Sequence, residues 1–228
     1  MLHLIKLASL QEGALFQPST IHADFEKAFH NAVEISLPAT EVKGCFFHFT
    51  QCIWRNCQKH GLQTAYKNDP DIQKMVRRAA VLPLVAPKDI GDVWLNTLAE
   101  APATDNCVNF LDYVTENWVE GVWGRDVWNH HHTMAARTNN NVEGWHHRMN
   151  SVAGKSHPNL FEFIRIIQRE QTLTDLKISQ LQAGGHFPPK RRKYRTQDEK
   201  LQRLKEQLQG EQLTLVEFAD KASFLLHL

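Results

Sequence analysis

Only two short segments of this chain are rich in β-forming residues, and this scarcity is what most limits the folds available to it. The segments cover residues 19–23 and 42–47. Between them, residues 25–36 repeat apolar side chains at the helical period, as at Phe25, Phe29 and Val33. Comparable patterns predict further helices over 49–60, 69–82, 89–99, 106–117, 139–153, 158–182 and 195–208. The sequence therefore predicts a helix-dominated α/β domain.

Composition narrows the class of protein. Of 228 residues, 42% are hydrophobic, which is enough to build a core. No apolar run reaches the roughly 18 residues that a membrane span requires, and the first residues are too polar for a secretory signal. Four cysteines in a chain of this length do not make a disulfide framework and favour a reducing compartment. These features argue against secreted mini-proteins and against a membrane protein.

Positive charge is concentrated late in the chain. Residues 186–209 hold eight Lys or Arg and three Asp or Glu, although the whole chain has a net charge of only +1. Glycine and proline pairs at 184–185 and 188–189 mark a break before this stretch. The sequence therefore predicts a domain over 1–183, a basic linker over 184–195 and a helical tail over 196–228.

The densest basic run is a candidate DNA-contacting segment. Its cations would contact a phosphate backbone or act as a nuclear import signal, and the alternative is a solvated linker. They are Lys190, Arg191, Arg192, Lys193 and Arg195.

Asp24 lies where a predicted strand passes into a predicted helix. A carboxylate at such a junction can point into a cleft beside the sheet and bind a divalent cation through its oxygens. The alternative is an N-cap, because aspartate satisfies free amides at the start of a helix.

Glu143 lies in a second polar cluster, on the flank of the helix predicted over 139–153. Asn139, Asn140 and His146 are near it in sequence, and Asn, Glu and His side chains together suit a hydrated metal or a phosphate. The alternative is a capping box, in which Asn140 is the N-cap and Glu143 its partner three residues later. Gly144 costs helix stability, about 1 kcal/mol, and so suggests a role beyond helix formation.

Two motifs that contain histidine or cysteine are weaker candidates for metal binding than the carboxylates. Cys45 and His48 form a Cys-x-x-His pair that suits zinc, but a closed zinc site needs four ligands. Cys52 and Cys57 would complete the set, yet the aromatic residues among them favour a buried core segment. The run His130-His131-His132 is interpreted as a polar surface turn, and the six tryptophans as core residues.

Three motifs together resemble one family. They are Ala23-Asp24-Phe25-Glu26-Lys27-Ala28, residues 43–55 with the sequence KGCFFHFTQCIWR, and residues 137–146 with the sequence RTNNNVEGWH. Their composition and order resemble the MULE transposase domain of Mutator-like elements, which in animals often follows a FLYWCH-type zinc finger. The resemblance covers roughly residues 1–175.

This resemblance implies a ribonuclease H-like fold with a helical insertion before the last acidic residue and helices at the C-terminal end. Members are DDE-type DNA transposases, in which three carboxylates hold two Mg²⁺ or Mn²⁺ ions for strand cleavage and transfer. Carried over by motif, Asp24 matches the second acidic residue and Glu143 the third. Asn139, Asn140 and His146 match positions beside the third, and Cys45 and His48 match the family's Cys-x-x-His signature. The implied partner is transposon-end DNA, and the implied location is the nucleus, with the cytoplasm as the alternative.

The sequence departs from the family pattern at its start. No aspartate precedes Asp24, and Glu12 is the only acidic residue there. We therefore expect a partial core that lacks the first strands and is inactive as this chain. The alternative is a domesticated module that binds DNA or a protein without cleavage. Unpaired strand edges in such a core would favour self-association.

Overall fold

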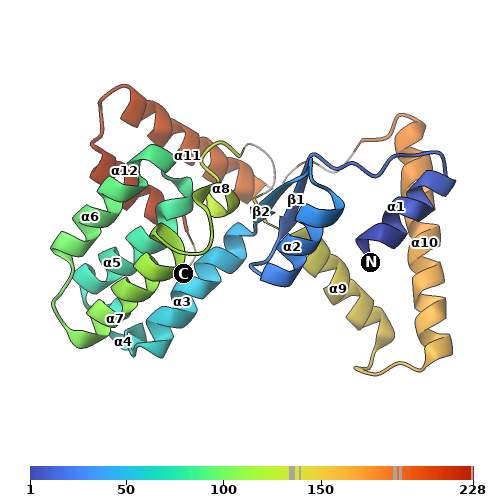
Figure 1. Ribbon diagram of the computed structural model, residues 1–228, viewed down its shortest axis with the longest axis horizontal. Coiled ribbons are helices and arrows are strands. Elements are labelled where there is room, and N and C mark those ends of the chain that lie inside the picture. Colours follow the sequence, from blue (N-terminus) through green and yellow to red (C-terminus); the bar gives the residue numbers. More distant parts are fainter. Residues whose placement is uncertain (134–136, 139, 187–188, 190–191, 227) are drawn as a thin grey trace. The chain divides into compact units, whose positions relative to one another are not determined.

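A computed structural model describes residues 1–133, 137–138, 140–186, 189, 192–226 and 228, without the side chains of Asn140 and Asn141. The chain divides into two compact units (Figure 1). Unit 1 contains residues 1–138 and 199–228, and unit 2 contains residues 139–198. This division differs from the boundary at residue 183 that the glycine and proline pairs predict.

A small parallel sheet is the only β-structure in the part of the chain that the structure describes. Strand β1 (Thr20–Ala23) pairs with β2 (Glu41–Gly44), with Thr20 opposite Glu41 and Ala23 opposite Gly44. Helix α2 (Lys27–Ser36) connects them, as parallel strands require a crossover. The predicted strand–helix–strand order and the helix-dominated α/β class are confirmed. The partial ribonuclease H-like core that the resemblance implies stays a prediction.

A second, small core lies beside the sheet. Helix α1 (Leu2–Gln11), which the sequence analysis did not predict, packs against α2. Leu2, Val33 and Leu37 are buried between them, and Ile21 and Val42 of the two strands pack against this cluster.

The rest of unit 1 is a helical body that follows β2. Its helices are α3 (Phe46–Lys59), α4 (Gln63–Asn68), α5 (Pro70–Val81), α6 (Ile90–Glu100), α7 (Asp105–Val114), α8 (Arg125–Trp128), the greater part of α11 (Arg192–Gln209) and α12 (Leu215–Ser223). Short turns of helix cover Leu82–Leu84, Pro87–Asp89 and Thr115–Val119. This body begins directly after β2, so the structure contains a long helical segment between Asp24 and Glu143.

Helix α5 is the centre of this body. Asp69 caps it by accepting hydrogen bonds from the amides of Asp71 and Ile72, and Pro70 occupies the first helical position. Its small residues Ala79 and Ala80 are fully buried, which allows α3, α6 and α12 to approach closely. The C-terminal residues are part of this core, because Phe218 and Ala222 of α12 are fully buried against it.

The histidine run is only partly the surface turn that the sequence predicts, because His131 and His132 form a turn with His132 exposed, whereas His130 is buried. The side chain of His130 is 1% exposed. Its amide donates to the carbonyl of Pro83 (2.7 Å), and its Nε2 donates to the carbonyl of Gly44 (2.8 Å). His131 bonds through Nδ1 to the carbonyl of Leu84 (3.0 Å). These bonds fix the segment after α8 to β2 and to the turn after α5.

Unit 2 contains α9 (Asn140–Ala153), α10 (Leu160–Gln182) and the beginning of α11. Asn159 and Glu162 form a reciprocal capping box that starts α10. Glu170 joins the two long helices, because its carboxylate accepts hydrogen bonds from the indole of Trp145 (3.1 Å) and from Arg148. Among the described residues, no helix is both long enough and apolar enough to cross a membrane.

Candidate metal and nucleic-acid site

Asp24 lies at the carboxyl end of the parallel sheet. It follows Ala23, the last residue of β1, and Cys45 follows Gly44, the opposing residue of β2. The amide of Cys45 donates to the carbonyl of Ala23 (2.6 Å), so Asp24 and Cys45 begin the segments that leave the same edge. Open α/β sheets bind ligands at this edge. The structure thus brings two of the sequence-predicted site residues together.

The carboxylate of Asp24 is not used as a helix cap. Helix α2 begins at Lys27, its N-cap residue is Glu26, and no side chain caps it. The capping alternative for Asp24 is therefore wrong. The Asp24 residue is exposed, and its carboxylate forms no hydrogen bond or ion pair with any residue that the structure describes. An exposed, uncommitted carboxylate suits a hydrated divalent cation.

The residues around Asp24 hold its backbone in place. His30 on α2 is 8% exposed, and its Nε2 donates to the carbonyl of Asp24 (2.8 Å). The ring of Phe25 packs edge-on against the rings of Trp118 and Trp123, with 4.8 and 5.4 Å between the ring centroids. Asp24 therefore lies between strand β1 and the packed ring of Phe25. These two contacts fix the direction in which the chain turns at Asp24.

Gly44 makes this anchoring possible. A Cβ at this position would lie 2.3 Å from Cε1 of the Phe25 ring, closer than real contacts allow. The ring of Phe25 therefore crosses the end of β2 where only glycine leaves room. No pattern in the sequence identifies this contact.

Histidine and lysine side chains line the sheet near Asp24. The rings of His22 and His130 stack at 6.1 Å, and Lys43 forms an ion pair with Glu41 (2.9 Å). Burial lowers the pKa of His130 to about 4, although its bond to Gly44 opposes this shift. Burial, and then the charge of Lys43, lowers the pKa of His22. Both pKa shifts favour neutral imidazoles near neutral pH, and the His130 ring already donates through Nε2 to the carbonyl of Gly44.

The cysteines belong to the core. Cys45 and Cys57 are fully buried, and burial together with the neighbouring Cys107 raises the pKa of the Cys57 thiol to about 11. A buried thiol that stays protonated is a poor zinc ligand. In the described ranges, no group of three or more His, Cys, Asp or Glu side chains is arranged to hold a metal ion. The four-ligand zinc alternative therefore has no support from the described residues, and the role of Cys45 and His48 alone stays a prediction.

Glu143 lies in unit 2, in the first turn of α9, and is half-buried. Helix α9 already includes Asn140, so Asn140 is not the N-cap that the predicted capping box requires. Asn139 and the side chain of Asn140 lie outside the described residues, whereas His146 is exposed. Convergence of Glu143 with Asp24 stays a prediction, since the two carboxylates belong to different units.

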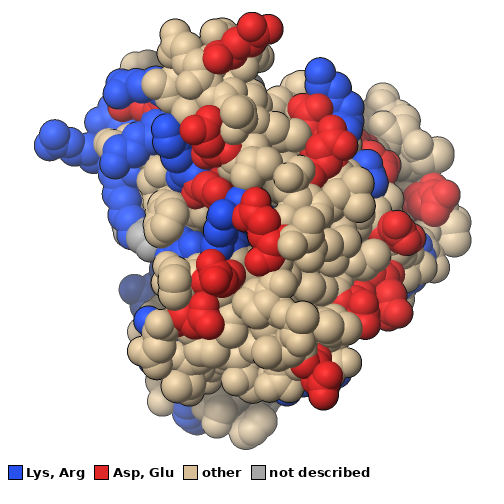
Figure 2. Space-filling view, turned by 90° about the vertical axis from the view of Figure 1, so that its left-hand side faces the viewer, with Lys and Arg blue, Asp and Glu red and all other residues tan. Residues whose placement is uncertain are grey.

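The basic run is only partly described. Lys190 and Arg191 lie outside the described residues, and Arg192, Lys193 and Arg195 form the exposed beginning of α11. Figure 2 shows that most Lys and Arg side chains of the displayed face gather toward its left side, whereas Asp and Glu are spread over the whole face. Contact with DNA stays a prediction.

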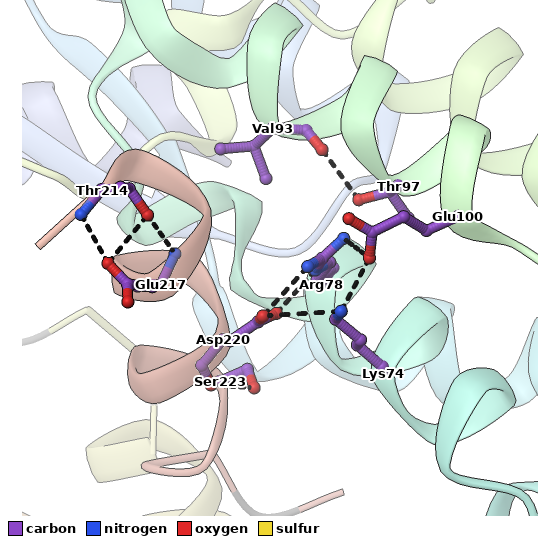
Figure 3. Close-up of polar contacts among 9 residues, drawn as sticks. All are labelled: Lys74, Arg78, Val93, Thr97, Glu100, Thr214, Glu217, Asp220 and Ser223. Carbon is purple, nitrogen blue, oxygen red and sulfur yellow. Dashed lines mark hydrogen bonds and ion pairs between the residues drawn. The ribbon is translucent and has the colours of Figure 1, made fainter.

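The sequence analysis missed a charged cluster in the helical body (Figure 3). Arg78 on α5 is 1% exposed, and its guanidinium contacts Asp220 of α12 through two hydrogen bonds (2.6 and 2.9 Å). Glu100 of α6 accepts from Arg78 (3.0 Å) and from Lys74 (2.6 Å). The cluster borders a cavity of about 260 Å³. Because Asp220 is 142 residues from Arg78, no local pattern reveals the pair.

The cluster stabilises the fold rather than offering a ligand site. The carboxylates of Asp220 and Glu100 balance the charges of Arg78 and Lys74, and Asp71 also lines the cavity. The hydrogen bond from Lys74 is the largest of the effects that lower the pKa of the Glu100 carboxyl. This carboxyl therefore stays ionised. Arg78 therefore joins α5, α6 and α12.

Comparison with known proteins adds no relative. No family model, curated protein or solved structure matches this chain. The resemblance to Mutator-like transposases therefore depends on the three sequence motifs alone.

Proposed function

We propose that this chain is a derivative of a Mutator-like DDE transposase and is inactive without further acidic ligands. The observation that supports this most is the position of Asp24, directly after β1 of a parallel strand–helix–strand unit. By motif, Asp24 matches the second acidic residue of the family that the motifs resemble. The helical body between β2 and α9 is consistent with the insertion that the resemblance implies.

The chemistry proposed for the site is binding of a divalent cation. Asp24 and Glu143 would hold Mg²⁺ or Mn²⁺, which in intact family members activates an attacking oxygen and stabilises the leaving oxygen. The Asp24 carboxylate fits this role because it is exposed and has no competing partner among the described residues. Two carboxylates without a third ligand would bind the ion weakly, so strand cleavage is not expected of this chain.

The test is thermal melting of the 228-residue chain during titration with Mg²⁺ or Mn²⁺. A ligand that binds the folded state raises the melting temperature as its concentration exceeds its Kd. We expect this rise in the natural chain and its loss in Asp24→Asn/Glu143→Gln. The matched control is Asp112→Asn/Glu120→Gln, which changes the charge equally at two exposed positions. Equal metal effects in all three proteins would refute the metal site.

A second candidate is a DNA-binding module without cleavage, favoured by the exposed cations at the start of α11. Reversing the charges of Lys190, Arg191, Arg192 and Lys193 should weaken DNA binding. It should also reduce the slope of log K against log salt by about 0.9 for each phosphate that the run neutralises. The control reverses four other exposed cations, Lys59, Lys67, Lys88 and Arg203. Equal weakening of DNA binding in both variants would exclude a specific role for the run.

A further inference from the structure

One side of α10 presents a stripe of four apolar and two polar side chains to solvent. Its residues follow one another at alternating intervals of four and three, and all are exposed. They are Leu160, Ile164, Ile167, Gln171, Thr174 and Ile178. This spacing keeps side chains on one face of a helix and is typical of the seam between two paired helices. We call these six residues the α10 stripe.

The contact between α9 and α10 does not cover this stripe. Glu170 marks the side of α10 that faces α9, because it contacts Trp145 and Arg148 and is 7% exposed. At about 100° per residue, the centre of the stripe lies roughly 80° around the helix from Glu170. Ile164 and Ile167 are 42% and 38% exposed despite the neighbouring helix. The stripe is therefore a second packing face.

The exposed apolar area is large for a single helix. Leu160 is 68% exposed and Phe161, on the flank of the stripe, is 73% exposed. Phe163, Ile164, Ile167 and Ile178 are each about 40–50% exposed. With about 200 Å² for a large side chain, the four apolar residues of the stripe expose roughly 400 Å², and the flanking Phe161 and Phe163 bring the total to roughly 600 Å². That equals the largest apolar patches of typical monomers and approaches the roughly 800 Å² that each partner buries in a stable interface.

We propose that the α10 stripe is a self-association interface, occupied by the same stripe of a second copy of this chain. A two-fold pair of α9–α10 hairpins would form a four-helix arrangement in which each stripe covers the other. Helix α10 carries three acidic and three basic residues, so two copies bring no net charge against each other. Gln171 and Thr174 lie in the middle of the stripe, where polar side chains in a seam fix the alignment of the partner. This inference does not depend on the proposed transposase ancestry.

The test measures the mass of the full chain by light scattering across about 1–100 μM, a range that spans micromolar affinity. We expect a concentration-dependent increase from 26.3 kDa to twice that mass. Ile164→Glu/Ile167→Glu should weaken the dimer at least about 100-fold, because it buries unpaired charges. The matched control, Thr172→Glu/Leu176→Glu, adds the same charge at exposed positions on the other side of α10 and should dimerise normally.

Hydrogen exchange of the natural chain provides a second readout that needs no variant. Amides of residues 160–178 should exchange more slowly at high protein concentration, where the stripe is covered. A monomer at every concentration would overturn the proposal, as would equal dimerisation of the stripe variant and its control. Protection of α10 that does not change with concentration would also overturn it, because it would place the covering surface within one chain.

Discussion

Replacing Asp220 by alanine is expected to destabilise unit 1 strongly. The substitution removes both hydrogen bonds of the Asp220 carboxylate and leaves the guanidinium of Arg78, whose side chain is 2% exposed, with Glu100 as its remaining carboxylate. Breaking a buried ion pair costs about 3–5 kcal/mol when the remaining charge has no partner. Because Glu100 remains and the Asp220 side chain is 30% exposed, we expect a smaller cost, about 2–3 kcal/mol.

The assay is urea and thermal unfolding followed by circular dichroism. A destabilisation of this size lowers the melting temperature by about 5–10 °C for a unit of this length. Glu100→Gln is the first control, and it should cost at most about 1 kcal/mol because the Glu100 side chain is 47% exposed. The second control, Arg78→Met/Asp220→Ala, removes the stranded charge and should recover part of the stability. A cost below about 0.5 kcal/mol for Asp220→Ala would refute the argument that this pair joins α12 to α5.

Three further predictions concern the sheet, the histidine run and α9. The pKa of His130 is about 4 in the folded chain and about 6.5 in the unfolded chain. Between these pH values the unfolded state binds more protons, so the free energy of unfolding falls as the pH decreases through this window. The free energy of unfolding should drop by about 2 kcal/mol from pH 8 to pH 5, and His130→Gln should show a smaller drop over the same range. Gly44→Ala should cost about 1–3 kcal/mol in urea unfolding because its Cβ meets the Phe25 ring, and Phe25→Leu in the same chain should reduce this additional cost. Gly144→Ala should increase the helicity of unit 2 and raise its free energy of unfolding by about 0.5–1 kcal/mol, because a Cβ at this position meets nothing within 4 Å. An unchanged free energy of unfolding would show that Gly144 does not destabilise α9.

Several features of the fold were predictable from local patterns. The strand–helix–strand order around Asp24 follows from two β-rich segments and one helical period, and α5 (Pro70–Val81) matches the helix predicted over 69–82. Helix α1 was missed, and α12 was predicted only as an undivided part of the helical tail over 196–228. The capping box that starts α12, Thr214 with Glu217, is visible in the sequence and could have revealed it.

The candidate site was only partly predictable. Motifs identified Asp24 and Glu143, but spacing alone could not decide between a cap and a ligand. That choice depended on where α2 begins, and the structure placed its N-cap at Glu26. His130 was assigned to the surface because a run of three histidines is polar. The carbonyls of Pro83 and Gly44, which are distant in sequence, accept hydrogen bonds from its backbone amide and from its Nε2. Its burial is possible because these bonds satisfy its polar atoms.

The sequence by itself determined the helix-dominated class and the strand–helix–strand order, and its motifs singled out the candidate carboxylates, because periodicity and motifs act over a few residues. Only the tertiary structure decided that Arg78 is buried against Asp220, that Phe25 crosses Gly44 and that α12 completes the core of unit 1. These contacts join residues far apart in the chain. Their energies depend on burial and on the partners available after folding, and no local pattern of residues encodes either.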